Sequence, residues 1–413
     1  MSMIIKNIDC LVTCKGSHKK TKDEIKDAGI IENGYVVIKD DVIIEVGQGN
    51  DYKKYINDET TIIDGTGKTV TPGLVDPHTH LVYGGSRENE LPLKLNKMGY
   101  IDILNAGGGI LSTVKNTRKA SLDELVEESK KRLDIMLNYG TTTVESKSGY
   151  GLDLETELKM LEVNKKLNEI HPIDVVSTFM VLHALPTEYK DDREGFLKIA
   201  KEMLPHITKE NLAEFVDCFC EDGVFSVDEC REFLEEGKKY GLIPKVHGDE
   251  VEPMGGAELA GEVKAISAEH LIAASDDGIK ALAKNNVVAV LLPSTAFYLM
   301  VGSFARARDM IENGVAVALA TDCNPGTSPT ESMQAVMTFA AFGMRMFPEE
   351  IINAMTINSA AAINREKEIG SIEPNKKADI VMFNSKNLNY LIYHFGINAV
   401  HKVIKNGKIV VEN

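Results

Sequence analysis

The chain lacks the long apolar runs, the signal-peptide pattern and the basic blocks that mark several large classes of protein. Its most apolar stretch, Val287–Leu292, is far shorter than the roughly 20 residues that a membrane helix needs. The first residues, Met1–Asp9, lack the succession of basic, apolar and small residues found in signal peptides. We therefore expect a cytoplasmic protein that has no membrane partner.

Cysteine is scarce, and the few cysteines do not form a recognisable motif. The six are Cys10, Cys14, Cys218, Cys220, Cys230 and Cys323, with no Cys-x-x-Cys pair among them. A chain of this length does not need a disulfide scaffold, so we expect reduced thiols. The lack of a Pro-Cys-x-x-Cys element with His-x-Glu also excludes the small zinc nucleobase-deaminase fold.

Positive charge is in deficit, with 46 Lys and Arg against 62 Asp and Glu and a net charge of -16. No dense block of Lys and Arg with interleaved aromatic residues occurs, which argues against nucleic-acid binding. The charged segment Lys15–Lys26 is expected to be a solvated loop or insertion. The 413 residues exceed the roughly 250 that one barrel requires, so a second domain is expected.

The two ends of the chain differ in pattern from its middle. Short alternating runs typical of strands occur at both ends, in Gly34–Lys39, Val42–Val46, Ala378–Phe383 and Val400–Val411. Asn406-Gly407 is a strong hairpin signal within the last of these. We therefore predict one composite β-sandwich domain built from residues 1–65 and 361–413.

The middle of the chain, residues 66–360, alternates strands with helices. A Ser121 cap opens a helical pattern that Gly140 ends, and the β-branched run Thr141–Glu145 follows. Repetition of this unit predicts an α/β fold, a (β/α)8 TIM-type barrel with catalytic residues at the C-terminal ends of its strands. The glycine-rich segment Asn105–Ile110 lacks the ending of a phosphate loop and is expected to be a substrate loop.

Four residues at predicted strand ends form a candidate metal site. In the segment Thr71–His80, His78 and His80 point to the same side, because residues two apart in a strand do so. Such a pair alone could equally cap backbone groups or face solvent. Later apolar runs end at His247 and Asp322, and three imidazoles with one carboxylate suit Zn²⁺ and also Fe²⁺ or Mn²⁺. The alternative is four separate polar residues that are satisfied individually.

Several motifs carry a resemblance to a known family. Pro72–His80 is similar to the opening of the amidohydrolase superfamily, and its continuation to Glu90 resembles the imidazolonepropionase family. Further blocks that resemble this family are Glu145–Leu152, Leu182–Pro186, Val246–Glu250, Thr321–Pro329 and Gly370–Ile380. The first block identifies only the superfamily, whereas the blocks together are specific.

The resemblance implies a reaction, a cofactor and an assembly. The reaction is hydrolytic ring opening of 4-imidazolone-5-propanoate to N-formimidoyl-L-glutamate in histidine degradation. The cofactor is one divalent or trivalent metal ion, Zn or Fe, and the assembly is a homodimer. Binuclear members of the superfamily use a carboxylated lysine at the end of the fourth barrel strand, and Lys147 is expected near such a place. With a single metal, we expect Lys147 to lie behind the ligands or to face solvent.

Seven residues are expected to bind substrate beside the metal, namely Arg87, Tyr150, His183, Glu250, Asn324, Gly326 and Thr327. A guanidinium can hold a carboxylate by two parallel hydrogen bonds, so Arg87 is the expected anchor for the propionate. Tyr150 follows a strand end between two glycines, from which its phenol could reach the ligand, or it serves loop packing. Asn324, Gly326 and Thr327 follow Asp322 and are expected to contact substrate, with ordinary turn chemistry as their alternative.

Acid and base chemistry is expected of the remaining ionisable residues. The resemblance implies that Glu250 contacts the substrate nitrogen and moves the proton, that His270 activates or orients water, and that His183 contacts substrate. Asp322 could also act as the base while it binds the metal. Structural roles at strand ends are the alternative for each.

Two other functions are compatible with the barrel. Another cyclic amidohydrolase or a nucleobase aminohydrolase would share the metal ligands, but Arg87 and Tyr150 argue against it. A non-catalytic scaffold related to dihydropyrimidinase-like barrels should have lost ligands, and this chain retains them.

Overall fold

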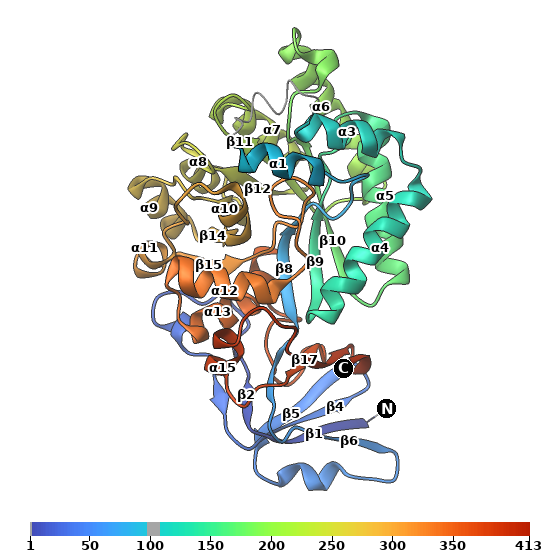
Figure 1. Cartoon of the computed structure of the whole chain (residues 1–413), viewed down its shortest axis with the longest axis vertical. Coiled ribbons are helices and arrows are strands. Elements are labelled where there is room, and N and C mark those ends of the chain that lie inside the picture. The colour runs from blue at the N-terminus through green and yellow to red at the C-terminus, as the bar shows by residue number, and fades with distance from the viewer. Residues whose placement is uncertain (1, 97–107) are drawn as a thin grey trace.

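A sheet of eight parallel strands forms the centre of the computed structural model, which describes residues 2–96 and 108–413 (Figure 1). Along the sheet these strands are β8 (Leu74–Thr79), β9 (Thr141–Lys147), β10 (Asp174–Leu182), β11 (Phe215–Cys220), β12 (Ile243–Gly248), β13 (Ser267–His270), β14 (Val288–Leu291) and β15 (Ala316–Leu319). Residues 105–107 of the expected substrate loop lie outside the described part of the chain.

The sheet closes into a barrel where its first strand meets its last. The amide of Asp322 donates to the carbonyl of His78 at 3.1 Å, and the amide of His80 donates to the carbonyl of Cys323 at 3.0 Å. Thr79 and Cys323 form a parallel bridge at the same place. The predicted (β/α)8 barrel is therefore confirmed, and its seam runs directly past the candidate metal ligands.

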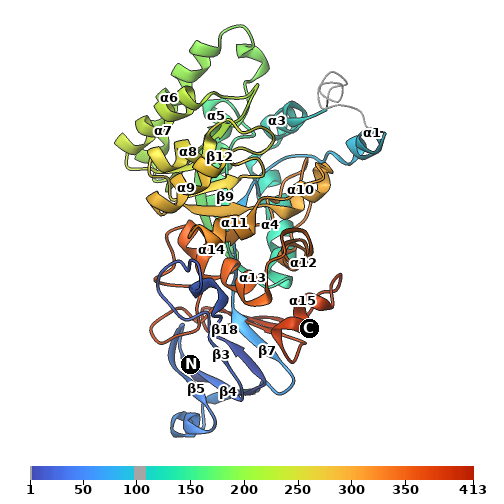
Figure 2. The ribbon, with the colours of Figure 1, turned by 90° about the vertical axis from the view of Figure 1, so that its left-hand side faces the viewer.

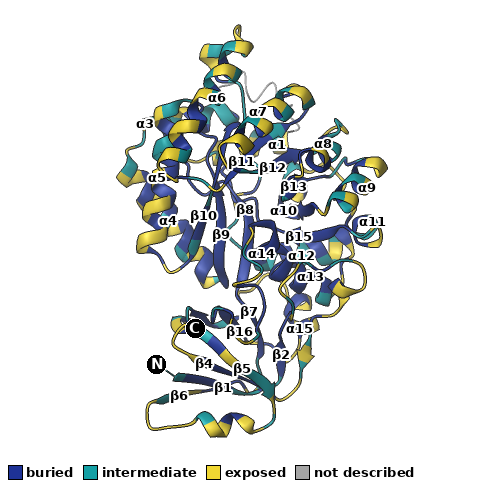
Figure 3. Ribbon diagram, turned by 180° about the vertical axis from the view of Figure 1, so that it is seen from behind, coloured by how far each residue is buried: buried dark blue, intermediate teal, exposed yellow. Residues whose placement is uncertain are grey.

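Helices follow the strands and cover the outside of the barrel. Figure 3 shows buried strands surrounded by helices whose outward faces are exposed. The α-helices are α1 (Leu91–Leu95), α3 (Ile110–Lys119), α4 (Leu122–Asn138), α5 (Leu154–Ile170), α6 (Arg193–Lys209), α7 (Val227–Lys239), α8 (Gly256–Glu262), α9 (Asp276–Asn285), α10 (Pro293–Leu299), α11 (Ala307–Glu312), α12 (Met333–Met344), α13 (Pro348–Ala354), α14 (Ile357–Ala362) and α15 (Leu388–Tyr393). Two short 3₁₀ helices, η3 (Glu88–Glu90) and η4 (Thr187–Tyr189), lie in barrel loops, whereas η1 (Glu24–Lys26) and η2 (Asp51–Tyr55) precede the barrel, and η2 packs against N-terminal strands. The predicted Ser121 cap is present as a capping box with Glu124.

The two ends of the chain together build two further sheets at one end of the molecule (Figures 1 and 2). Their strands are β5 (Val42–Gln48), β4 (Gly34–Lys39), β1 (Ser2–Ile8) and β6 (Thr60–Asp64) in one sheet, and β18 (Lys408–Glu412), β17 (Val400–Lys405), β16 (Ile380–Phe383), β7 (Thr69–Pro72), β2 (Cys10–Val12) and β3 (Ile30–Ile31) in the other. A shared core that includes Ile5, Val36 and Ile380 joins them. The predicted small domain from both termini is confirmed as part of the fold class, and its boundaries at residues 65/66 and 360/361 stay a prediction.

The segment Lys15–Lys26 is only partly the solvated loop that its charge predicts. Ile25 is fully buried, and Lys20 is 5% exposed. The amide of Lys20 donates to Asn358 Oδ1 at 2.6 Å, and the Lys20 ammonium donates to the carbonyl of Asp27. The Asn358 side chain thus ties the segment to α14, and the Asp27 carbonyl compensates for the burial of the Lys20 ammonium. Within the described residues, no helix is long and apolar enough to cross a membrane.

Candidate metal centre and active site

The predicted site residues come from different strands but meet at the C-terminal end of the barrel. Most of them line one cavity of about 560 Å³, namely His80, Arg87, Tyr150, His183, His247, Glu250, His270, Asp322, Asn324 and Thr327. His78 is completely buried next to these ligands, and Gly326 lies against Arg87. A parallel barrel produces this convergence because all its strands end at the same face.

The four candidate ligands place nitrogen and oxygen atoms at separations that suit a single ion. Asp322 Oδ1 lies 3.3 Å from His78 Nε2 and 3.6 Å from His80 Nε2. His80 Nε2 lies 3.4 Å from His247 Nε2. Ligand atoms about 2.0–2.2 Å from a tetrahedral Zn²⁺ are roughly 3.3–3.6 Å apart, which matches these separations.

The polar atoms in this cluster also lack other partners. His78 Nε2 and Asp322 Oδ1 are buried atoms that accept or donate no hydrogen bond in the described part of the chain. Burial works against a charged His78, but Glu269 and Asp322 outweigh it and raise the His78 pKa to about 9. The carboxylates of Glu269 and Asp322 thus stabilise positive charge at His78. Burial and neighbouring imidazoles lower the pKa values of His80 and His247, so that both are neutral donors. The donor set fits a metal cation.

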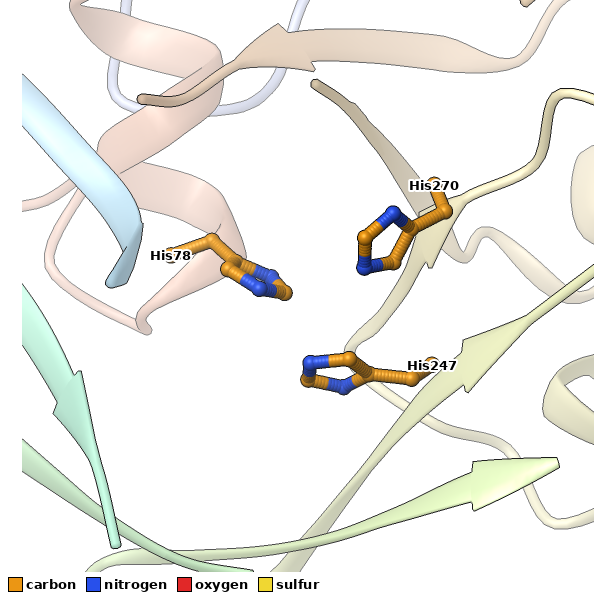
Figure 4. Close-up of side chains that lie close together, drawn as sticks. All are labelled: His78, His247 and His270. Carbon is orange, nitrogen blue, oxygen red and sulfur yellow. The ribbon is translucent and has the colours of Figure 1, made fainter. Parts of the chain in front are cut away.

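His270 lies next to the same cluster. Figure 4 shows the rings of His78, His247 and His270 converging on one space, and these three also satisfy the spacing of a metal-binding group. The nearest acid to His270 is Glu250, whose Oε1 lies 3.6 Å from His270 Nδ1. His270 is therefore placed between the candidate ligands and Glu250.

His270 and Asp322 adopt a backbone conformation that residues other than glycine rarely take. The φ angles are 71° at His270 and 54° at Asp322. Such left-handed conformations cost free energy and persist where the surrounding structure fixes them, often at functional sites. At Asp322 the fixing contacts include a hydrogen bond of 2.6 Å from the Thr295 hydroxyl to Oδ2.

Buried carboxylates lie behind the imidazoles. Asp217 Oδ2 is 2.9 Å from His247 Nδ1, and Glu269 Oε2 is 2.5 Å from His78 Nδ1. A carboxylate this close to Nδ1 favours the tautomer that carries the proton there, which leaves Nε2 free for a metal. The sequence motifs did not point to either acid, although Asp217 and Glu269 stand inside buried strands, where an unpaired charge is costly.

Lys147 does not lie where the sequence was expected to put it. It ends β9, the second strand of the barrel, whereas the fourth strand, β11, ends at Cys220. It is also fully buried, so it does not face solvent. Of the two positions expected for Lys147, behind the ligands or facing solvent, the structure has the first.

Arg87 faces the cavity with one edge of its guanidinium engaged. Its Nε and Nη2 each donate to Glu90 at 2.9 Å, and Glu90 is 2% exposed. The second proton of Nη2 and both protons of Nη1 are left for another acceptor. Gly326 packs against the guanidinium so closely that a Cβ there would lie 2.1 Å from Nη1.

The loop that carries Tyr150 is held by a carboxylate. Glu157 is fully buried and accepts backbone N–H groups of Gly149, Gly151 and Leu152 at 2.9–3.2 Å. His183 lies beside this loop, with Nδ1 3.1 Å from the carbonyl of Gly149. Burial and then His247 lower the pKa of His183 to about 3, so its imidazole is neutral.

The loop that carries Glu250 is held in the same way. Glu221, another lining residue of the cavity, accepts the amides of Glu250 at 2.8 Å, Val251 at 3.1 Å and Glu252 at 3.0 Å. Burial, then the charges of Asp322 and Glu221, raise the pKa of Glu250 to about 8. The raised pKa favours the protonated form of Glu250.

Asn324 and Thr327 use much of their hydrogen-bonding capacity within their own loop. Asn324 Oδ1 accepts the amides of Gly326 at 2.8 Å and Thr327 at 2.7 Å. Its Nδ2 donates to the carbonyl of Asp322 at 2.7 Å. This is the turn chemistry that the sequence allowed as an alternative, and it fixes the loop beside Asp322.

Comparisons with known proteins agree with this arrangement. The model of the amidohydrolase family matches residues 69–410. An imidazolonepropionase of Alkaliphilus metalliredigens (strain QYMF) is 55% identical, with 100% of this chain and 98% of that protein covered. One of Geobacillus thermodenitrificans (strain NG80-2) is 54% identical, with 99% and 98% covered. The chain belongs to the imidazolonepropionase family of amidohydrolases.

Solved structures show the same fold at low sequence identity. An E. coli guanine deaminase matches with a TM-score of 0.76 and 16% identity, covering 100% of this chain and 99% of that one. A triazine hydrolase variant has the same TM-score of 0.76 with 15% identity, covering 100% and 95%. At such identities the likeness shows only that the fold is shared.

Proposed function

We propose that this chain hydrolyses the ring amide of 4-imidazolone-5-propanoate to N-formimidoyl-L-glutamate, a step of histidine degradation. Relatives named imidazolonepropionase, 55% identical over the full length, support this reaction. The structural observation that carries the proposal is a single cavity with a guanidinium and a cluster of metal-binding atoms on its wall.

Arg87 is the proposed anchor of the propionate. Glu90 occupies the edge formed by Nε and Nη2, so the end formed by Nη1 and Nη2 remains for a bidentate carboxylate. Tyr150 and His183 line the same cavity and are proposed to contact the substrate. Asn324, Gly326 and Thr327 are proposed to form the wall on which the substrate rests, with Gly326 making room for the guanidinium.

His78, His80, His247 and Asp322 are proposed to hold one divalent or trivalent ion, Zn or Fe. When bound, such an ion lowers the pKa of a coordinated water toward 7 and polarises the carbonyl under attack. The chain contributes the neutral imidazoles of His80 and His247, the His78 ring, which must lose its proton to bind the ion, and the Asp322 carboxylate, whose pKa falls to about 2 because His78 and His270 outweigh its burial. This set of nitrogen and oxygen donors suits both Zn and Fe.

Glu250 and His270 are proposed to move the protons. Glu250 carries a proton at neutral pH and gives it to the ring nitrogen that leaves the carbonyl carbon. Burial lowers the pKa of His270, so its neutral imidazole can orient and deprotonate the attacking water. Asp322 is the alternative base, since its low pKa keeps its carboxylate charged at neutral pH.

A homodimer is proposed through an exposed aromatic surface on α10, α12 and the segment after α15. Phe297 is 58% exposed, Phe342 67% and Phe395 64%. Phe342 and Phe395 have ring centroids 6.4 Å apart, and Phe297 stacks on Phe339. An apolar surface of this kind is typical of an interface between subunits. Light scattering of the wild type and of Phe342→Glu tests it, and a monomeric wild type would contradict it.

The reaction is tested by following the ring absorbance of 4-imidazolone-5-propanoate that is generated in place, with ammonia assayed in parallel. Rapid loss of absorbance, formation of formimidoyl-glutamate and no ammonia are expected. Asp322→Asn is expected to be inactive, whereas Asp277→Asn on the exposed surface of α9 serves as the matched control. Release of ammonia would favour an aminohydrolase, and no acceleration by metal-replete enzyme would refute the substrate.

A further inference from the structure

Beneath the candidate ligands lies a buried cluster of charges with Lys147 at its centre. Lys147 Nζ lies 2.7 Å from Glu145 Oε1, 2.9 Å from Asp217 Oδ2 and 2.8 Å from Glu269 Oε2. All four side chains are 0% exposed. The contact with Glu145 is a hydrogen bond, and the contacts with Asp217 and Glu269 are close ion pairs, so three carboxylates surround the one ammonium.

Two of these carboxylate oxygens also face the candidate metal-binding histidines. Asp217 Oδ2 contacts both Lys147 Nζ and His247 Nδ1, the latter at 2.9 Å. Glu269 Oε2 contacts both Lys147 Nζ and His78 Nδ1, the latter at 2.5 Å. Lys147 is therefore separated from each imidazole by a single shared oxygen atom.

The third carboxylate connects the cluster to the strand that carries His78 and His80. Glu145 Oε2 accepts the amide of Thr79 at 3.4 Å, and the Thr79 hydroxyl donates to the carbonyl of Glu145 at 2.7 Å. Lys147 thus contacts the carboxylates beside His78 and His247. Through Glu145 it is also connected to the backbone of Thr79, which lies between His78 and His80.

We propose that Lys147 is a positioning residue that sets the metal affinity of the centre by fixing the carboxylates behind His78 and His247. The proposal rests on the metal centre described under the proposed function. An imidazole binds a metal through Nε2 only when its ring is turned correctly and Nδ1 carries the proton, and a carboxylate held close to Nδ1 favours both. Without the ammonium, Glu145, Asp217 and Glu269 repel one another and leave these positions.

Lys245 provides a matched comparison within the same cluster. It is also completely buried, and its Nζ lies 2.8 Å from Glu269 Oε1 and 2.8 Å from Ser267 Oγ. It therefore neutralises the same Glu269 but contacts the oxygen that faces away from His78. Loss of Lys245 removes an equal buried charge and leaves Asp217 and Glu145 in place.

A competing effect has the opposite sign. An ammonium close to the centre also repels a bound cation, so its removal would tighten metal binding if repulsion dominated. Positioning predicts weaker binding instead, because misdirected rings lose coordination bonds. The direction of the change in affinity therefore separates the two effects.

The test uses full-length protein stripped of metal, with Zn²⁺ affinity measured by competition against a chromophoric chelator. For Lys147→Met we expect the dissociation constant of Zn²⁺ to rise about 10–100-fold, the range found when residues that orient metal ligands are lost. For Lys245→Met we expect a rise of less than about threefold on the same scale. Melting temperatures of the metal-free proteins are measured in parallel.

An unchanged or tighter affinity in Lys147→Met would overturn the proposal, as would equal losses in both variants. A wild type that binds no Zn²⁺ would refute the metal centre itself, which is a separate failure. If Lys147→Met does not fold, Lys147→Met with Glu145→Gln removes one charge of each sign. The same loss of affinity is expected there, and wild-type affinity would overturn the role of Lys147.

Discussion

Replacing Gly326 by alanine is expected to displace the guanidinium of Arg87 and thereby to impair substrate binding. A Cβ at position 326 would lie 2.1 Å from Arg87 Nη1 and 2.6 Å from Cζ. To regain an ordinary van der Waals contact of about 3.4 Å, Nη1 must move by about 1.3 Å. Backbone strain is not the cause, because Gly326 does not have a positive φ.

Neither side of this contact can move freely. The Arg87 side chain is 10% exposed and is held by two hydrogen bonds of 2.9 Å to Glu90. Gly326 is fixed by its amide, which donates to Asn324 Oδ1, and by its carbonyl, which accepts from Lys94 Nζ at 2.6 Å. A misplacement of about 1 Å in a positioning group costs on the order of 100-fold in rate, equivalent to about 2.7 kcal/mol.

We expect kcat/KM of Gly326→Ala to fall about 100-fold in a steady-state assay, with metal content unchanged. The control is a double-mutant cycle with Arg87→Ala, in which no guanidinium is present to displace. In that background Gly326→Ala should cost little more. A kcat/KM of Gly326→Ala within threefold of the wild type, or an equal cost in both backgrounds, would show that the contact does not position Arg87.

Three further predictions concern protons, loops and the metal. The pKa of Glu250 is raised to about 8, and a bound cation lowers it, so kcat should fall as pH rises through a value at or below about 8. This fall in the pH–rate profile should be absent in Glu250→Gln. If the fall persists in that variant, another group causes it. Glu157→Ala leaves the buried amides of Gly149, Gly151 and Leu152 without an acceptor, which should lower the free energy of unfolding by about 1–3 kcal/mol. Because this loop carries Tyr150, kcat/KM should also fall. An unchanged melting curve would contradict this. Removal of the metal by a chelator should lower the melting temperature, and Zn²⁺ at 1,000 times its dissociation constant should restore about 4 kcal/mol; equal melting with and without metal would count against a site in the native state.

The barrel and the metal ligands could be predicted because their signals are local. Buried strands read as apolar runs, and each candidate ligand stands at or just after the end of such a run, as His247 in β12 and Asp322 after β15 do. His78 and His80 are neighbours on one strand. The barrel topology then brings together residues that the sequence separates widely.

The supporting acids could not be predicted in the same way. Glu157 and Glu221 act as acceptors for several backbone amides, and where those amides gather depends on the folded loops. A partial signal existed for the charge cluster, because Glu145 and Lys147, like Lys245 and His247, are two apart and share a strand face.

The strand number of Lys147 was wrong for a related reason. The described part of the chain between β8 and β9 forms helices, including the long α4, and contributes no barrel strand. Periodicity identifies strands one at a time, whereas their number around a barrel depends on which of them pair. Lys147 therefore belongs to the second strand and serves the ligands from behind.

The seam of the barrel has a consequence for how the protein matures. The amide of Asp322 bonds to the carbonyl of His78, so that the first and last strands meet at the same place as the candidate ligands. A ribosome delivers His78 early and Asp322 only after most of the chain has emerged. The complete ligand set can therefore exist only after the barrel has closed, and a metal ion that binds there would link the first strand of the barrel to the segment after the last.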